Sequence, residues 1–215
     1  MLLGGGWGDR AKDNELEKNR KSQGENFEPG NLWIAESDLH GSAVEQGGRY
    51  VVVQRTAGQV GSELLAAATR RAREGGHRLL GLFGVGNYSG HLPYRTADGK
   101  YDPVRGKGER GETYQPADIT ENPTLAQLTS AALDVLSRNP QGFWLMVEAG
   151  DVDWANHDNN LDNSIGAVLS GDEAIRTITD WVERNSNWQD SLMIVTADHG
   201  HFLVLDRPEL LLPRK

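Results

Sequence analysis

The sequence predicts an α/β fold, a three-layer sandwich with a mostly parallel central sheet, and two patterns support this. Short apolar or β-branched runs alternate along the chain with longer segments of helical periodicity, which is typical of parallel sheets covered by helices. Two of the apolar runs, residues 143–147 and 192–196, are each followed by carboxylates and imidazoles. Loops that follow the carboxyl ends of parallel strands commonly present ligands in such sheets. Both patterns therefore predict an α/β domain with a ligand-binding site at one edge of its sheet.

The first half of the chain supplies the pattern strand, helix, strand. Residues 2–3 resemble the tail of a strand, and the charged, glycine-rich stretch from residue 5 to about 35 predicts an exposed connection. Residues 50–54 are dense in β-branched side chains and predict a buried strand. A helix is predicted over 62–73, with Ser62 as its N-cap, and a second strand over 79–83.

The second half begins with a long excursion over residues 84–123, rich in glycine, proline and charge. Thr124 and Gln127 have the spacing of a capping box and predict a helix that runs to about Asn139. After the first ligand-rich loop, apolar residues on one stripe predict another helix from about 164 to 185. The two apolar runs named above complete the predicted sheet.

Composition excludes several classes of protein. The 215 residues carry a net charge of −9, which argues against nucleic-acid binding by a basic surface. There is no cysteine, so thiolate metal sites and disulfides are excluded. No apolar run approaches the roughly 20 residues that a membrane span needs. We expect residues 1–215 to form one partial domain, because the chain begins and ends abruptly, and we expect a fragment.

The first ligand-rich loop predicts a metal site. Asp153 and His157 are four residues apart, so both face the same side of a helical turn and can grip one ion. Mixed carboxylate and imidazole donors suit Zn²⁺ best, with Mn²⁺ and Co²⁺ as alternatives. Glu148, with no imidazole near it in sequence, better suits an oxygen-ligated Mg²⁺. Trp154 either packs as an ordinary aromatic or walls the site.

The second cluster follows residues 192–196. Asp198 and His199 are adjacent, and in a turn both side chains can converge on one ion. His201 is placed to orient a ligating carboxylate. Either cluster alone is more often structural, since an aspartate at a strand end commonly caps the next turn. The presence of both, each after an apolar strand, favours a shared metal centre.

Three further histidines, His40, His77 and His91, stand alone in the sequence. A lone histidine is more often a surface or structural residue than a ligand, and we predict that role for each of them.

The ligand-bearing segments resemble those of a known family. Residues 139–157 and 191–201 are similar to the metal-binding segments of alkaline phosphatases, and residues 123–129 resemble the helix that precedes the first of them. Weaker similarity to strand-end motifs of that family is found at residues 3–6 and 80–83. The resemblance implies the α/β sandwich of that family.

The resemblance also implies two zinc ions and one magnesium ion. His201 would support the ligands, and Trp154 stands where other members have lysine or histidine. The implied ligands are Glu148 for magnesium, Asp153 and His157 for the first zinc, and Asp198 and His199 for the second.

The implied activity is metal-dependent hydrolysis of small phosphate monoesters. The nucleophilic serine, a bridging aspartate and a phosphate-binding arginine of the family have no counterpart here, and a last zinc histidine is expected beyond residue 215. We therefore expect no catalytic nucleophile in this chain and an inactive isolated fragment. The resemblance also implies a periplasmic or secreted parent enzyme, for which a homodimer is compatible.

Two alternatives stay open on sequence grounds. One is a sister metallohydrolase of the same superfamily, such as a phosphodiesterase, sulfatase or mutase. The other is a non-catalytic metal-binding protein. All of the metal-based interpretations require the carboxyl of Asp153 to lie near the imidazole of His199, since a separation well over about a dozen ångströms exceeds the span of a two-ion centre.

Overall fold

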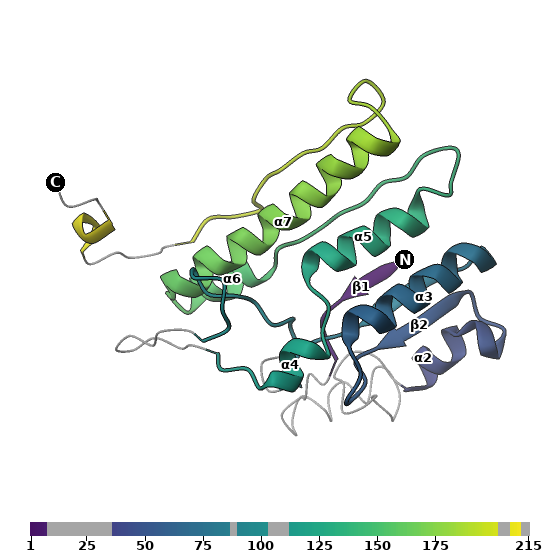
Figure 1. The fold of residues 1–215 in the computed structure, drawn as a ribbon, viewed down its shortest axis with the longest axis horizontal. Coiled ribbons are helices and arrows are strands. Elements are labelled where there is room, and N and C mark those ends of the chain that lie inside the picture. Colours follow the sequence, from purple (N-terminus) through teal and green to yellow (C-terminus); the bar gives the residue numbers. More distant parts are fainter. Residues whose placement is uncertain (8–35, 87–89, 103–111, 202–206, 212–215) are drawn as a thin grey trace.

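A computed structural model describes residues 1–7, 36–86, 90–102, 112–201 and 207–211 (Figure 1). The predicted exposed connection over residues 5–35 lies almost wholly outside these ranges. The elements in chain order are β1 (Leu2–Gly4), α2 (Glu36–Ser42), η1 (Val44–Gln46), β2 (Tyr50–Gln54), α3 (Gly61–Gly75), β3 (Arg78–Leu82), α4 (Pro116–Thr120), α5 (Leu125–Leu136), α6 (Asp151–His157), α7 (Leu161–Asn185) and η3 (Pro208–Leu211).

In the described part of the chain, the sheet contains three parallel strands in the order β1-β3-β2. Leu80 in β3 is opposite Leu2 on one side and Val52 on the other. Parallel neighbours need a crossover connection, and α3 provides it between β2 and β3. The small parallel sheet with helices packed on it confirms the α/β class, and the strands predicted over 50–54 and 79–83 are confirmed to within one residue.

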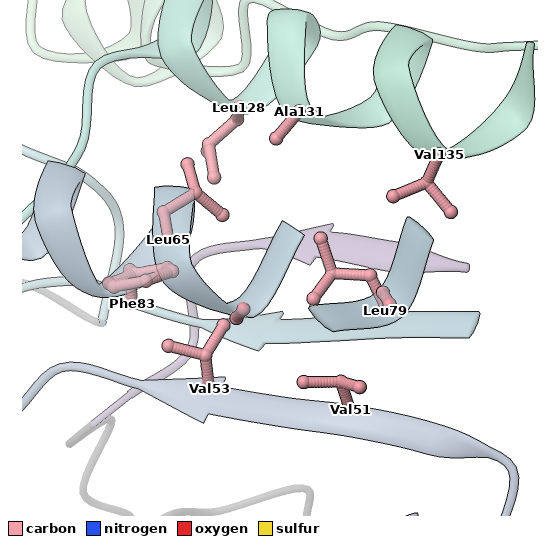
Figure 2. Packing of buried hydrophobic residues seen from close by; sticks show 10 residues of the cluster. Val51, Val53, Leu65, Leu79, Phe83, Leu128, Ala131 and Val135 are labelled. Atoms are coloured by element: carbon pink, nitrogen blue, oxygen red, sulfur yellow. The ribbon is translucent and has the colours of Figure 1, made fainter. Parts of the chain in front are cut away.

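The main hydrophobic core lies between this sheet and the helices α3 and α5 (Figure 2). Alternate residues of β2 point into it, as the period of two in a strand requires. From the sheet come Val51, Val53 and Leu79, and Phe83 follows β3. The helices contribute Leu65, Ala68, Ala72, Leu128, Ala131 and Val135.

The ends of the two core helices test the capping predictions. At α5 the predicted capping box forms, with Gln127 N–H donating to Thr124 Oγ1 at 3.2 Å and Thr124 N–H to Gln127 Oε1 at 2.8 Å. At α3 the prediction of Ser62 as N-cap was wrong, because the N-cap is Val60, which makes no side-chain cap bond. The next residue is glycine because a Cβ there would meet the Glu121 carbonyl oxygen at 2.3 Å.

The carboxyl ends of β2 and β3 are joined to α4 by a buried ionic network around Arg55. Its guanidinium contacts Asp118 at 2.9 Å and Glu121 at 2.8 Å, and it donates to the Gly84 carbonyl at 2.9 Å. The face of Trp7, which follows β1, lies 4.9 Å from the guanidinium carbon. This network fixes the sheet edge from which the loops of the site depart. The long excursion predicted for 84–123 thus contains a short helix, α4.

The prediction of strands over residues 143–147 and 192–196 was wrong for the part of the chain described here. Both segments run extended beside α7 but pair with no strand among the described residues (Figure 1). Apolar side chains on them are consequently exposed, 81% for Trp144 and 75% for Ile194. A strand needs a hydrogen-bonded neighbour, and β-branched composition alone does not supply one.

Helix α7 is the element against which the first extended segment packs. Phe143 packs edge-on against Trp181 near its carboxyl end, and Ala149 approaches Gly171 further back, so the first extended segment runs antiparallel to it. The predicted helix over 164–185 is confirmed and begins three residues earlier, at Leu161. In the described ranges, no helix is long and apolar enough to cross a membrane.

Candidate metal centre

The first part of the site is helix α6, which carries Asp153 and His157. Their spacing brings the two side chains to one face, with His157 Nε2 3.5 Å from Asp153 Oδ1. The short helix is joined to α7 because Ser164 Oγ donates to Asn156 Oδ1 at 2.8 Å. Asn160, buried at the start of α7, accepts a hydrogen bond from the Asn163 N–H and caps that helix. The turn between the helices therefore holds α6 in place.

The second part of the site comes from the segment after the second extended run. His199 Nε2 lies 3.2 Å from Asp153 Oδ1, and His201 Nε2 lies 3.0 Å from the same oxygen. The ring of His201 is 4.7 Å from that of His157 and 4.8 Å from that of His199, centroid to centroid. Three imidazoles therefore surround one carboxylate oxygen, which satisfies the distance requirement set by the sequence.

That oxygen is the feature that points to a cation. Asp153 Oδ1 is buried and, among the residues that the structure describes, has no hydrogen-bond partner by geometry, although three imidazole nitrogens lie within 3.5 Å of it. Ligand atoms of Asp153, His199 and His201 all lie within 4.8 Å of one another, close enough for the three side chains to hold one metal ion. Buried polar atoms are normally paired, so this arrangement fits a dication with oxygen and nitrogen donors, such as Zn²⁺.

Three of the predicted ligands, Glu148, His157 and Asp198, lie outside this group, although His157 stays 3.5 Å from Asp153. The side chain of Asp198 is 90% exposed, and its Oδ2 is 3.9 Å from His199 Nε2. Its other oxygen accepts a hydrogen bond from the His199 N–H at 3.0 Å. Glu148 is exposed near the end of the first extended segment. The structure thus brings His199 nearer to Asp153 than to Asp198, whereas the sequence pairs it with Asp198.

Charges around the site shift several pKa values. The hydrogen bond to the Gly200 carbonyl, followed by the charges of Asp198 and Asp153, raises the pKa of His199. On the other side of α6, burial raises the pKa of Asp151 to about 7, and Glu112 and Glu148 add to this effect while His91 opposes it.

Sequence reasoning missed the neighbours of α6. His91, expected to be a surface or structural residue, contacts the side chains of Glu112 at 2.8 Å and Asp151 at 3.5 Å. Burial by itself lowers the pKa of His91, but the hydrogen bond and charge of Glu112 and the charge of Asp151 outweigh it and raise the pKa. Trp154 is half exposed and stacks on the His91 ring. The three partners lie 21 to 63 positions from His91, so no local pattern could have found them.

Comparison with known families matches residues 1–209 to the family described as alkaline phosphatase. The chain belongs to the alkaline phosphatase family. It is 34% identical to an alkaline phosphatase of Escherichia fergusonii over 151 residues, which are 69% of this chain and 30% of that protein. It is 35% identical to the alkaline phosphatase of Escherichia coli over 137 residues, 63% of this chain and 28% of that protein.

An insect relative extends the similarity beyond bacteria. The chain is 38% identical to a membrane-bound alkaline phosphatase of Bombyx mori over 97 residues. Those residues are 45% of this chain and 17% of that protein. The chain therefore spans less than a third of the length of these alkaline phosphatases. The match to the alkaline phosphatase family covers the residues of the cluster around Asp153, because it includes both α6 and residues 199–201.

Proposed function

We propose that this chain forms the metal-holding part of an enzyme that hydrolyses phosphate monoesters. The observation that carries the proposal is the convergence of three imidazole nitrogens on Asp153 Oδ1, at 3.0 to 3.5 Å. Membership of the alkaline phosphatase family supports phosphate monoesters as the substrates rather than the diesters or sulfates of the alternative readings.

In this proposal, Asp153, His199 and His201 hold one zinc ion, and His157 completes or supports that site. Zinc, when bound, supplies a Lewis-acidic centre that stabilises the charge developed in phosphoryl transfer. The chain's own residues fix the donors: α6 presents the carboxylate, and the segment after residue 197 presents two imidazoles. Their orientation in advance lowers the cost of assembling the site around a dianionic phosphate.

Glu148 and Asp198 belong to the outer part of the proposed centre. Both are exposed carboxylates close in sequence to the cluster, and oxygen donors of this kind suit magnesium and a second zinc. We propose Glu148 as a magnesium ligand and Asp198 as the carboxylate ligand of a second zinc ion.

We further propose that the nucleophile is supplied by polypeptide other than these 215 residues. The chain spans less than a third of its relatives' length, so the remaining parts of such a protein have room for it. Export of the parent enzyme to the periplasm or the exterior, and its assembly as a homodimer, remain predictions from the family resemblance.

Zinc binding by the full 215-residue chain tests the proposal directly. Metal-free protein is titrated with Zn²⁺ in competition with a chromogenic chelator, and Asp153→Asn is compared with the wild type. We expect high-affinity binding by the wild type and a loss of at least about tenfold in Asp153→Asn, because the variant replaces the carboxylate that all three imidazoles face with a neutral amide, a much weaker metal ligand.

The matched control is Asp102→Asn, since Asp102 is an exposed aspartate in the excursion after β3. It should bind zinc as the wild type does. Equal zinc affinity in Asp153→Asn and wild type would remove the basis of the proposal. In a parallel assay with p-nitrophenyl phosphate, we expect no significant turnover by the zinc-loaded chain, and robust turnover would show that the nucleophile is present within it.

A further inference from the structure

The backbone of His91 is tied to the carboxyl edge of the sheet. Its carbonyl accepts a hydrogen bond from the Val85 N–H at 2.9 Å, just after β3, and the preceding carbonyl of Gly90 accepts one from Gly6 N–H at 2.6 Å, just after β1. The chain approaches so closely here that a Cβ on Gly84 would meet the Gly90 oxygen at 1.8 Å. His91 is therefore anchored to two strands at once.

The side chain of His91 leaves this anchor and reaches helix α6. The ring is 11% exposed, with Nε2 2.8 Å from Glu112 Oε1 and Nδ1 3.5 Å from Asp151 Oδ1. Its face stacks on Trp154, with centroids 5.6 Å apart and planes inclined by 25°. His91 thus touches α6 at two points, and these flank Asp153 in sequence.

The first turn of α6 is held by packing of Val152 against the buried cluster of Tyr94, Ala155 and Ala167, and by the contacts of Asp151 and Trp154 with His91. The helix is only seven residues long, and its N-cap, Gly150, offers no side-chain cap bond. Short helices are marginal without tertiary contacts, so the orientation of α6 depends on what its side chains touch. Asp151 in the first turn meets His91, and Asn156 further along meets Ser164 of α7.

We propose that His91 is a positioning residue of the metal centre: through Asp151 and Trp154 it holds the first turn of α6 against the sheet edge and so sets where Asp153 stands. This inference rests on the proposed function, because it assumes that Asp153 ligates a metal. An imidazole between Asp151 and Glu112 also separates two carboxylates that would otherwise face each other in a partly buried space.

Cobalt binding to the full chain tests the role of His91. Co²⁺ replaces Zn²⁺ in sites of this type, and its visible absorption reports the ligand geometry. In His91→Gln we expect Co²⁺ to bind about ten- to a hundredfold more weakly, with an altered visible spectrum, as is typical when a residue that orients a ligand is lost. His77→Gln, in the turn between α3 and β3, is the control and should match the wild type.

A double-variant cycle shows whether His91 acts through Asp151. If it does, Asp151→Asn should weaken Co²⁺ binding as well, and the double variant His91→Gln/Asp151→Asn should add little to either single change. Should His91→Gln fail to fold, Glu112→Gln replaces it in the cycle. That change keeps the histidine but weakens the contact between its Nε2 and residue 112. We expect a smaller shift of the same Co²⁺ spectral bands.

The possible results separate this inference from the proposed function. If the wild type binds no Co²⁺ or Zn²⁺, both proposals fail. If the wild type binds and His91→Gln binds with the same affinity and spectrum, the role of His91 fails and the metal centre stands. Fully additive losses in the cycle also overturn it, because they would mean that His91 does not act through Asp151. A change in melting temperature without any spectral change would indicate a purely structural residue.

Discussion

His201 Nε2 lies 3.0 Å from Asp153 Oδ1, although the 25-residue helix α7 separates the two residues in sequence. The chain leaves α6, runs the length of α7, and returns as an extended segment to the same end of that helix (Figure 1). The ligands of the candidate centre thus depend on a return path along α7. Several measurable consequences follow from this arrangement and from the packing around it.

Zinc should stabilise the folded chain through this convergence. A ligand that binds only the folded state at a hundredfold excess over its Kd adds about 2.7 kcal/mol to the free energy of unfolding. Thermal denaturation should therefore show a higher Tm with zinc than with a chelator. In His201→Gln the zinc-induced rise should shrink, whereas His40→Gln, on the exposed surface of α2, should keep it. An unchanged rise in His201→Gln would argue that His201 does not contribute.

The ionic network at the sheet edge should be costly to break. In Arg55→Ala the carboxylates of Asp118 and Glu121 lose their buried partner, and the free energy of unfolding should fall by about 3–5 kcal/mol. Arg71→Ala removes an exposed ion pair with Glu45 and should cost about 1 kcal/mol at most. Urea denaturation of both variants checks the contrast, and equal losses would contradict it.

Asp151 should make the stability of the metal-free protein fall as pH rises. Its pKa is about 7 in the folded state against 3.8 for a free carboxyl, so between these values the folded state holds a proton that the unfolded state has lost. The contribution is complete below about pH 4 and is lost by about pH 7. The raised pKa of His91 acts in the same direction, from about pH 6.5 upwards.

Melting curves of the metal-free chain between pH 4 and 8, with a chelator present, measure this effect. In Asp151→Asn the decline of Tm over that range should be shallower than in the wild type, because the titrating carboxyl is gone. Asp102→Asn should retain the wild-type slope. A slope unchanged in Asp151→Asn would mean that its carboxyl titrates alike in the folded and unfolded states.

The two extended segments, residues 143–147 and 192–196, have no strand partner among the described residues and should make the isolated chain self-associate. Contiguous exposed apolar surface promotes association, and unpaired strand-like edges add to the tendency. Lysine at two of the most exposed positions, in the variant Trp144→Lys/Ile194→Lys, should lower light scattering and dye binding without lowering Tm, because neither side chain packs in the core. Lysine at the partly buried Leu145 and Met193 should instead destabilise the fold.

Local sequence patterns correctly predicted the elements that depend on residues nearby in the sequence. The β-branched run of β2 and the capping box of Thr124 were confirmed because both follow from nearby residues. The strand predictions at Phe143 and Leu192 failed because a strand also needs a neighbour, and the described residues offer none. The same limit applied to His91, whose role depends on contacts with Glu112 and Asp151 that no local spacing encodes.

The candidate metal site was partly predictable from the spacing of residues in the sequence. Asp153 and His157 face one side of α6, as an interval of four residues in a helix requires. The closeness of Asp153 and His199 was predicted, because both ligand clusters follow apolar runs. The approach of His201 to the same oxygen was not, because it depends on the direction in which the chain leaves residue 197. Which of the predicted ligands bind which ion stays a prediction.

An ion bridging Asp153 and His201 would also act as a cross-link. It would close a ring of roughly 48 residues around α7, and in the chain-entropy treatment a ring of that size restricts the unfolded chain by about 4 kcal/mol. The sequence has no cysteine with which to make such a bridge covalently. A dication would give this chain a reversible substitute for a disulfide, one whose strength follows the supply of metal rather than the redox state of its surroundings.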